Sequence, residues 1–104
     1  DLPVILWAID TLDWKTKSAS KTASAILQGA GNGVIILCHD TWPSTARALE
    51  TALPQLIAKG YQLVTVSEMM SFREEPIKPG WEYSHLDPKK IVSVTPYGQE
   101  AAAP

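Results

Sequence analysis

The stretch Val34-Ile35-Ile36-Leu37-Cys38-His39-Asp40 decides the fold, because a continuous apolar run ends abruptly in two polar residues. Apolar runs without alternation are typical of strands buried on both faces, as in a parallel sheet. A second run of this kind, Val4-Ile5-Leu6-Trp7-Ala8-Ile9, ends at Asp10. Both runs are therefore predicted as parallel strands, and Leu63-Val64-Thr65-Val66 is predicted as a third.

A helical pattern separates the first two predicted strands. The residues that recur there on one face of a helix are Ala23, Ile26, Leu27 and Ala30. A helix is therefore predicted from about Ser18 to Ala30, with Ser18 or Ser20 as its cap. Gly29, Gly31 and Gly33 are expected to end it.

A second helical pattern follows the second strand and begins at Pro43 or Ser44. Its predicted apolar face consists of Ala46, Leu49, Leu53, Leu56 and Ile57. Pro54 is expected to kink or split this helix, and Lys59-Gly60 is expected to end it. After the third strand, Ser67 is predicted to cap a short helix that reaches about Phe72.

Alternating strands and helices predict an α/β fold with a parallel sheet. In such folds, chemistry is concentrated at the carboxyl ends of the strands. This rule selects two loops, Asp10 to Trp14 after the first strand and His39 to Trp42 after the second.

Composition narrows the possible classes of protein. The chain has 104 residues, enough for one domain at most, and 45% of them are hydrophobic. The net charge of −2 comes without a basic block, so nucleic acid is not an expected partner. A single cysteine excludes an internal disulfide, and the longest apolar run is too short for a transmembrane segment.

The two ends of the chain differ from its middle. The chain begins at Asp1 without Met, three residues before a predicted strand, and this indicates that an upstream segment has been removed. Five of the eight prolines fall within residues 73–104. The predicted organisation is therefore a structured part over residues 1–72 and a Pro-rich C-terminal extension over 73–104.

His39 and Asp13 are the candidate catalytic residues. His39 directly follows a predicted strand, and Asp13 lies at the matching end of the neighbouring strand. A carboxylate beside an imidazole stabilises the imidazolium and fixes the orientation of the ring, as a general acid requires. Two simpler interpretations stay open: His39 hydrogen-bonds a neighbouring loop, or Asp13 caps the following helix while Trp14 covers the edge of the core.

The sequence predicts no metal site within this chain. Leu37 is expected to point to the same side as His39, and Cys38 to the opposite side. Cys38 and His39 therefore diverge, and the other histidine, His85, stands alone in the Pro-rich segment. The run Gly29-Ala30-Gly31-Asn32-Gly33 precedes a strand, whereas a dinucleotide-binding loop follows one.

The two loops resemble motifs of a known family. Ile9-Asp10-Thr11-Leu12-Asp13-Trp14-Lys15 is similar to the fourth motif of the NodB-homology polysaccharide deacetylases, carbohydrate esterase family 4. Ile36-Leu37-Cys38-His39-Asp40 is similar to their fifth motif. The 26-residue spacing from Asp13 to His39 and the ending Lys59 to Val66 also resemble peptidoglycan N-acetylglucosamine deacetylases. The resemblance covers about residues 3–72.

The resemblance implies a fold and a reaction. The fold is α/β, the C-terminal part of a distorted (β/α) barrel with parallel strands. The reaction is the removal of N-acetyl groups from a polysaccharide by water that a divalent metal, usually zinc, activates. By motif matching, His39 is the general acid and Asp13 the carboxylate that pairs with it. Leu37 and Trp14 wall the pocket for the acetyl methyl group.

The resemblance also implies a missing half. The family's catalytic base, its Asp-His-His metal ligands and the arginine of its third motif precede these two motifs, and none of them is present here. Residues 1–72 thus resemble the C-terminal half of the domain, which is expected to be inactive alone. The expected partners are the N-terminal half, as a segment or a cleaved companion chain, and the polysaccharide. The expected location is extracellular or at a bacterial cell wall.

Three other functions stay open. In a non-catalytic glycan-binding α/β module, sugar rings would stack on the tryptophans, which are Trp7, Trp14, Trp42 and Trp81. An acetyl xylan esterase of the same family would share both motifs. A flavodoxin-like domain without a site would fold alone as a cooperative monomer.

Overall fold

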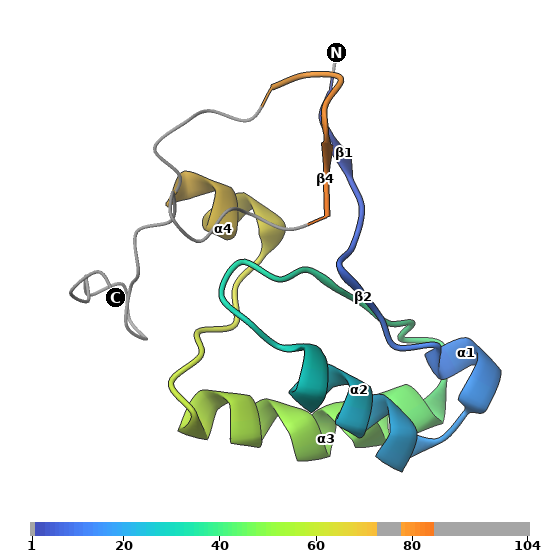
Figure 1. Ribbon diagram of the computed structural model, residues 1–104. Helices are drawn as coiled ribbons and strands as arrows, with labels where there is room; N and C mark the ends of the chain where they lie inside the picture. The colour runs from blue at the N-terminus through green and yellow to red at the C-terminus, as the bar shows by residue number, and fades with distance from the viewer. Residues whose placement is uncertain (1, 73–77, 85–104) are drawn as a thin grey trace.

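The computed structural model describes residues 2–72 and 78–84, which form a mixed α/β structure with two pairs of parallel strands (Figure 1). The strands are β1 (Val4–Ile5), β2 (Ile9–Asp10), β3 (Ile36–Leu37) and β4 (Glu82–Tyr83). The helices are α1 (Asp13–Thr16), α2 (Ala19–Gly29), α3 (Pro43–Ala58) and α4 (Val66–Ser71). β1 pairs with β4 and β2 pairs with β3, both in parallel. The predicted parallel α/β class is confirmed in this coarse form.

The core lies between α2 and α3, which cross the lower half of Figure 1 side by side. Its buried residues are Ala23, Ile26, Ala48, Ala52 and Leu56. Three of these are alanines, so the two helix axes can approach each other closely. Around this centre pack partly buried residues, namely Ala19, Leu27, Ala30, Ile36, Leu49, Leu53 and Tyr61.

The helix α2 agrees with its sequence pattern. Ser18 is the N-cap, and its hydroxyl oxygen accepts a hydrogen bond from the Lys21 N–H at 3.3 Å. Ala23 and Ile26 are buried on the predicted face. The helix ends at Gly29, so the prediction for this element is confirmed.

The helix α3 begins as predicted but does not break at its internal proline. Pro43 occupies the first turn, where its missing N–H needs no partner. The helix then runs without interruption to Ala58, so Pro54 does not split it, and the alternative prediction of a kink is not tested. Pro54 is exposed, so the helix loses one hydrogen bond on the side where water can reach the backbone. Gly60, with a φ of +94°, follows the end of the helix as predicted.

The buried face of α3 is rotated from the predicted one. The buried residues are Thr45, Ala48, Ala52 and Leu56. Leu49 and Leu53 are only partly buried beside them, and Ala46 and Ile57 are exposed. The small residues face α2 because they allow the close contact between the helices, and the larger leucines fill the flanks.

The run Val4 to Ile9 is not the single doubly buried strand that its composition predicts. It forms β1 and β2, separated by residues 6–8. Both residues of β1 are exposed, and Trp7 between the strands is 43% exposed. Among the described residues, each strand pairs with one other strand. The second edge of each strand is therefore not paired with another strand there.

The third predicted strand, residues 63–66, is wrong as well. Residues 61–65 belong to no strand or helix, and Leu63 is exposed. The predicted cap Ser67 is also wrong, since Thr65 caps α4. The Thr65 hydroxyl accepts from the Glu68 N–H at 3.1 Å, and Glu68 accepts from the Thr65 N–H at 3.2 Å. This capping box engages the local backbone of Thr65 in place of a strand partner.

The strand β4 was not predicted from the sequence, and it lies within the expected C-terminal extension. Val4 pairs with Glu82 and Ile5 with Tyr83, across a separation that local periodicity does not reveal. Tyr83 is buried, and its phenol oxygen accepts a hydrogen bond from the Lys78 N–H at 3.0 Å. Residues 73–77 and 85–104 of that extension lie outside the described ones.

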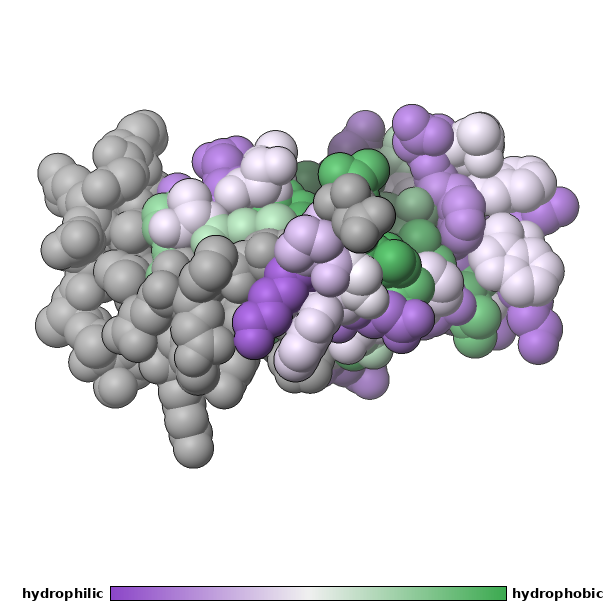
Figure 2. Space-filling model, turned by 90° about the horizontal axis from the view of Figure 1, so that it is seen from above, coloured by the Kyte–Doolittle hydropathy of each residue, from purple (hydrophilic) through white to green (hydrophobic). Residues whose placement is uncertain are grey.

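Apolar side chains reach the surface at several points, and Figure 2 shows hydrophobic patches among hydrophilic residues on the face seen from above. The exposed large apolar residues are Leu2, Val4, Ile5, Trp7, Leu12, Trp14, Ile57, Leu63 and Trp81. Among the described helices, none has the length and hydropathy that crossing a membrane requires.

The end of α2 touches β2 through a glycine. A Cβ atom at Gly29 would lie 2.8 Å from both Cγ1 and Cδ1 of Ile9 and 3.1 Å from its Cγ2. Isoleucine is β-branched, so its Cγ atoms cannot move away without a change of rotamer. Gly29 therefore permits the contact that sets β2 against the helical layer.

We expect Gly29→Ala to lower the free energy of unfolding by about 1 kcal/mol, because overpacking outweighs the better helix propensity of alanine. Urea denaturation of the protein measures this change. The matched background is Ile9→Ala, which removes the three clashing atoms, and there Gly29→Ala should be neutral or stabilising. An equal loss in both backgrounds would contradict the contact.

Candidate active site

The two predicted catalytic residues lie at the carboxyl ends of β2 and β3. The parallel register pairs Ile9 with Ile36 and Asp10 with Leu37, so both strands end at the same edge. Asp13 is the first residue of α1, just after β2, and His39 follows β3 by two residues. The expected meeting of the two loops is therefore confirmed.

A tight turn carries the chain from β2 to Asp13. Leu12 has a left-handed φ of 53°, which costs a non-glycine residue about 1 kcal/mol. Asp10 Oδ1 accepts the Leu12 N–H at 3.0 Å, and the Thr11 hydroxyl donates to the Leu37 carbonyl at 2.9 Å. The first bond stabilises the turn itself, and the second holds the turn against β3. The sequence predicts a loop over residues 11–14, whereas α1 begins within it at Asp13.

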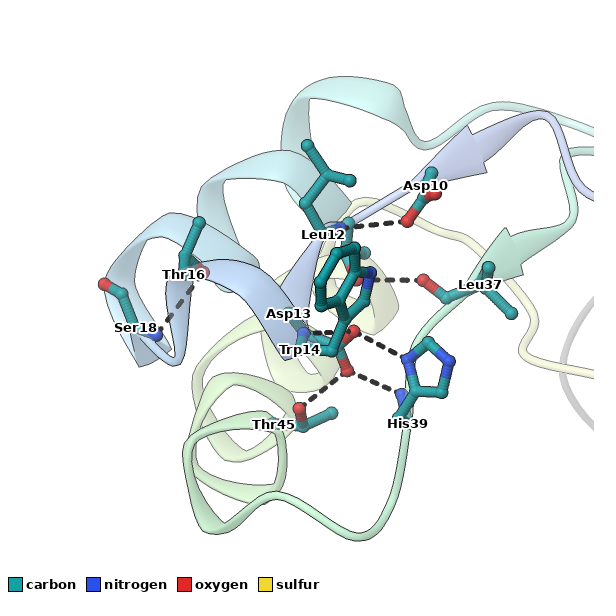
Figure 3. A network of polar contacts seen from close by, with 10 residues as sticks. Asp10, Leu12, Asp13, Trp14, Thr16, Ser18, Leu37, His39 and Thr45 are labelled. Atoms are coloured by element: carbon teal, nitrogen blue, oxygen red, sulfur yellow. Dashed lines mark hydrogen bonds and ion pairs between the residues drawn. The ribbon is translucent and has the colours of Figure 1, made fainter.

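The Asp13 carboxylate is the centre of the site (Figure 3). Its side chain is 0% exposed, and each of its oxygens accepts two hydrogen bonds. Oδ1 accepts from the Trp14 N–H at 2.9 Å and from His39 Nδ1 at 2.8 Å. Oδ2 accepts from the His39 N–H and from the Thr45 hydroxyl at 2.7 Å. The N-cap of α1 is Leu12, and the Asp13 carboxylate accepts one N–H of that helix, from Trp14, beside three donors from other segments.

These contacts keep Asp13 ionised. Burial by itself raises the pKa of Asp13, because it disfavours the charged form. The hydrogen bonds from His39, Thr45 and Trp14 outweigh burial and lower the pKa from 3.8 to about 2. At neutral pH the site therefore contains a buried negative charge.

The ionised carboxylate determines the state of the His39 ring. A carboxylate only accepts hydrogen bonds, so Nδ1 of His39 carries a proton toward Asp13. Nε2 is then the ring nitrogen free to exchange a proton with a substrate. The His39 side chain is 42% exposed while Asp13 is fully buried, so the pair has a buried end and an open end.

Thr45 is the member of the site that sequence reasoning missed. It lies in the first turn of α3 and is 0% exposed, on the same face as the core residues Ala48 and Ala52. A single polar residue at the start of an otherwise apolar helical face is the signal that marks it. The face of α3 predicted from the sequence is rotated from the buried one and does not include Thr45, so the prediction missed this residue.

Leu37 and Trp14 lie next to the Asp13–His39 pair in sequence and in Figure 3. Trp14 is 49% exposed, and Leu37 is partly buried. Their role as walls of an acetyl pocket stays a prediction. Close by, the Lys17 ammonium lies 4.5 Å from the centre of the Trp42 ring, which joins the end of α1 to the start of α3.

Cys38 lies between Leu37 and His39 and is partly buried. Burial raises the pKa of its thiol, and the negative charges of Asp13 and Asp40 raise it further. In the chain without a metal, the thiol is therefore protonated at neutral pH. Within residues 2–72 and 78–84, no three His, Cys, Asp or Glu side chains are grouped so that they could hold a metal ion.

The lowered pKa of Asp13 predicts a pH dependence of stability. Its ionised form contributes about 2 kcal/mol above pH 4, and this contribution is lost as the pH falls from 3.8 toward 2. We expect Asp13→Asn to unfold more easily at pH 7 and to lose less stability between pH 5 and pH 2. Urea denaturation across this range measures both effects.

The matched control is Asp40→Asn, which changes an exposed carboxyl group beside the same histidine. It should keep the wild-type dependence on pH. If Asp13→Asn and the wild-type protein lost equal stability below pH 4, the ionised Asp13 would not be the group responsible.

The chain has known relatives in sequence, although no family model matches it. It is 39% identical over 91 residues to the peptidoglycan-N-acetylglucosamine deacetylase PgdA of Listeria monocytogenes, covering 88% of this chain and 19% of PgdA. It is 34% identical over 74 residues to the peptidoglycan-N-acetylmuramic acid deacetylase PdaC of Bacillus subtilis, covering 71% of this chain and 16% of PdaC. The chain thus spans about a fifth or less of these relatives.

A solved structure agrees with the sequence matches. The solved structure of the T48 deacetylase with substrate superposes on this chain with a TM-score of 0.72 at 38% identity. The match covers 78% of this chain and 40% of the T48 deacetylase chain. Sequence and fold agree over most of the described residues. The chain therefore belongs to the polysaccharide deacetylases and corresponds to a part of their length.

Proposed function

We propose that this chain supplies the general-acid side of a hydrolase that removes N-acetyl groups from an N-acetylglucosamine polysaccharide such as peptidoglycan. The observation that carries the proposal is the 2.8 Å contact between His39 Nδ1 and the buried Asp13 Oδ1. The names of the relatives, which are peptidoglycan deacetylases, support the substrate class.

The reaction needs a proton at the leaving nitrogen. Water attacks the carbonyl carbon of the N-acetyl group and forms a tetrahedral intermediate, and the C–N bond then breaks readily only if the nitrogen is protonated. Nε2 of the His39 imidazolium donates that proton, so the products are the free amine and acetate. Asp13 stabilises the imidazolium and holds the ring in the direction of transfer.

Trp14 and Leu37 supply the apolar surface that this reaction needs for the acetyl methyl group. Trp14 is half exposed and directly follows Asp13, and Leu37 is the last residue of β3, two residues before His39. A methyl group between these side chains would leave the carbonyl carbon near the imidazole. This placement supports an acetyl pocket formed by the two residues.

The residues that activate the water are proposed to lie on another segment. In the part of the chain that the structure describes, the side chains do not form a metal-binding set, so no step is assigned to a metal here. On the basis of the resemblance alone, we propose that Asp-His-His ligands of a divalent metal, usually zinc, lie ahead of the two motifs found in this chain. Such a segment would supply both the metal and the catalytic base.

We also propose that the strands of this chain complete a larger (β/α) barrel with that N-terminal segment. The chain covers 40% of the matched deacetylase structure. Its described strands have one partner each, and β1 is exposed. Further parallel strands would bury these residues, as their continuous apolar sequence requires. The complete enzyme would act at the bacterial cell wall or outside the cell, where its proposed substrate lies.

We expect His39→Ala to lower acetate release from N-acetylglucosamine oligomers by at least about 100-fold, because the leaving amine loses its proton donor. The assay uses this chain joined to or mixed with the N-terminal segment, and the chain alone should release no acetate. Asp13→Asn should reduce the rate less, because the imidazole remains. Metal content, measured by mass spectrometry, should be unchanged in both variants.

The matched control is Glu50→Gln, an exposed residue of α3 away from the site, which should keep the wild-type rate. Wild-type turnover in His39→Ala would contradict the general-acid role. Binding of the oligomers by the chain alone, without turnover in any assembly, would favour a glycan-binding module instead.

A further inference from the structure

Two buried threonines in the helical layer differ in what their hydroxyl groups contact. Thr45 on α3 and Thr22 on α2 are both 0% exposed. The Thr45 hydroxyl donates to Asp13 Oδ2 at 2.7 Å, whereas Oγ1 of Thr22 has no hydrogen-bond partner among the described residues. The Thr22 hydroxyl is thus buried without a partner among the described residues, whereas the Thr45 hydroxyl connects the helical core to the site.

We infer that Thr45 is a positioning residue for the Asp13–His39 pair: its hydroxyl holds Oδ2 of Asp13 so that Oδ1 faces Nδ1 of His39. The other three donors to the carboxylate are the backbone N–H of Trp14 in the four-residue helix α1 and the backbone N–H and ring of His39 in the loop after β3. Thr45 is the donor that belongs to a long helix. It therefore ties the carboxylate to the rigid part of the fold.

The surroundings of Thr45 fix the direction of its hydroxyl. Pro43 starts α3 two residues before Thr45, and Ala48 and Ala52 continue its face into the contact with α2. A threonine in a helix uses mainly two rotamers, and the hydrogen bond to Asp13 selects the one in which the hydroxyl faces Oδ2. Without that hydroxyl, Oδ2 would keep only the His39 N–H, and the carboxylate could rotate about its terminal torsion.

The geometric part of the inference is tested in the full chain without any assay of activity. NMR of the Asp13 carboxyl carbon gives the midpoint of its titration, and NMR of the His39 ring nitrogens shows which of them carries the proton. Thr45→Val removes the hydroxyl and keeps the shape. We expect it to move the Asp13 midpoint to higher pH by about one pH unit and to weaken the signature of a protonated Nδ1 facing a carboxylate.

Two variants separate positioning from packing. Thr45→Ser keeps the hydroxyl and should restore the wild-type midpoint. Thr22→Val is the matched control, because it changes an equally buried threonine in the facing helix. It should leave the midpoint unchanged and should not destabilise the chain, since it removes an unpaired buried hydroxyl. If Thr45→Val does not fold, Thr45→Ala takes its place in the same titration.

The consequence for turnover rests on the proposed function. In the assembled enzyme, Thr45→Val should lower kcat for acetate release about 10-fold with little change in KM, because it disturbs the proton donor and not the sugar contacts. An Asp13 midpoint that stays at the wild-type value in the hydroxyl-free variant overturns the inference. A shifted midpoint in a protein whose assembled form releases no acetate supports the inference and overturns the proposed function alone.

Discussion

A buried carboxylate that must remain charged is the constraint on which the rest of this structure depends. Removing the Asp13 charge from water is costly, and the cost is offset only because both of its oxygens accept two hydrogen bonds. Those donors come from α1, from the loop after β3 and from α3. The three segments therefore have to converge on one point, and a shift of any of them leaves a buried charge without a partner.

The helical layer provides the rigidity that this convergence requires. The strands are two residues long, so the sheet alone cannot hold the two loops in place. Alanine contacts join α2 to α3, and Gly29 brings the end of α2 onto Ile9 of β2. Thr11 then fastens the turn after β2 to the carbonyl of Leu37 on β3. A chain of close contacts thus runs from the helical core to the carboxyl ends of the strands.

The site pairs a buried carboxylate with a solvent-accessible imidazole, which is the arrangement that a proton donor needs. Asp13 is fully buried, whereas His39 keeps part of its ring exposed beside Trp14. The Asp13 carboxylate keeps the proton on Nδ1 of His39, and Nε2 of His39 stays accessible to a substrate. The same molecule leaves the apolar residues of β1 exposed, and this is consistent with the proposal that further strands of a larger deacetylase cover them.

The sequence by itself determined the features that depend on neighbours along the chain. These include the cap at Ser18, the start of α3 at Pro43, the parallel α/β class and the placement of Asp13 and His39 at the ends of adjacent strands. Tertiary structure alone decided the division of Val4 to Ile9 into two strands, the pairing of β1 with β4 and the contact of Thr45 with Asp13. The physical reason is separation: these contacts join residues far apart in the chain, and whether an apolar run is buried depends on which partners cover it.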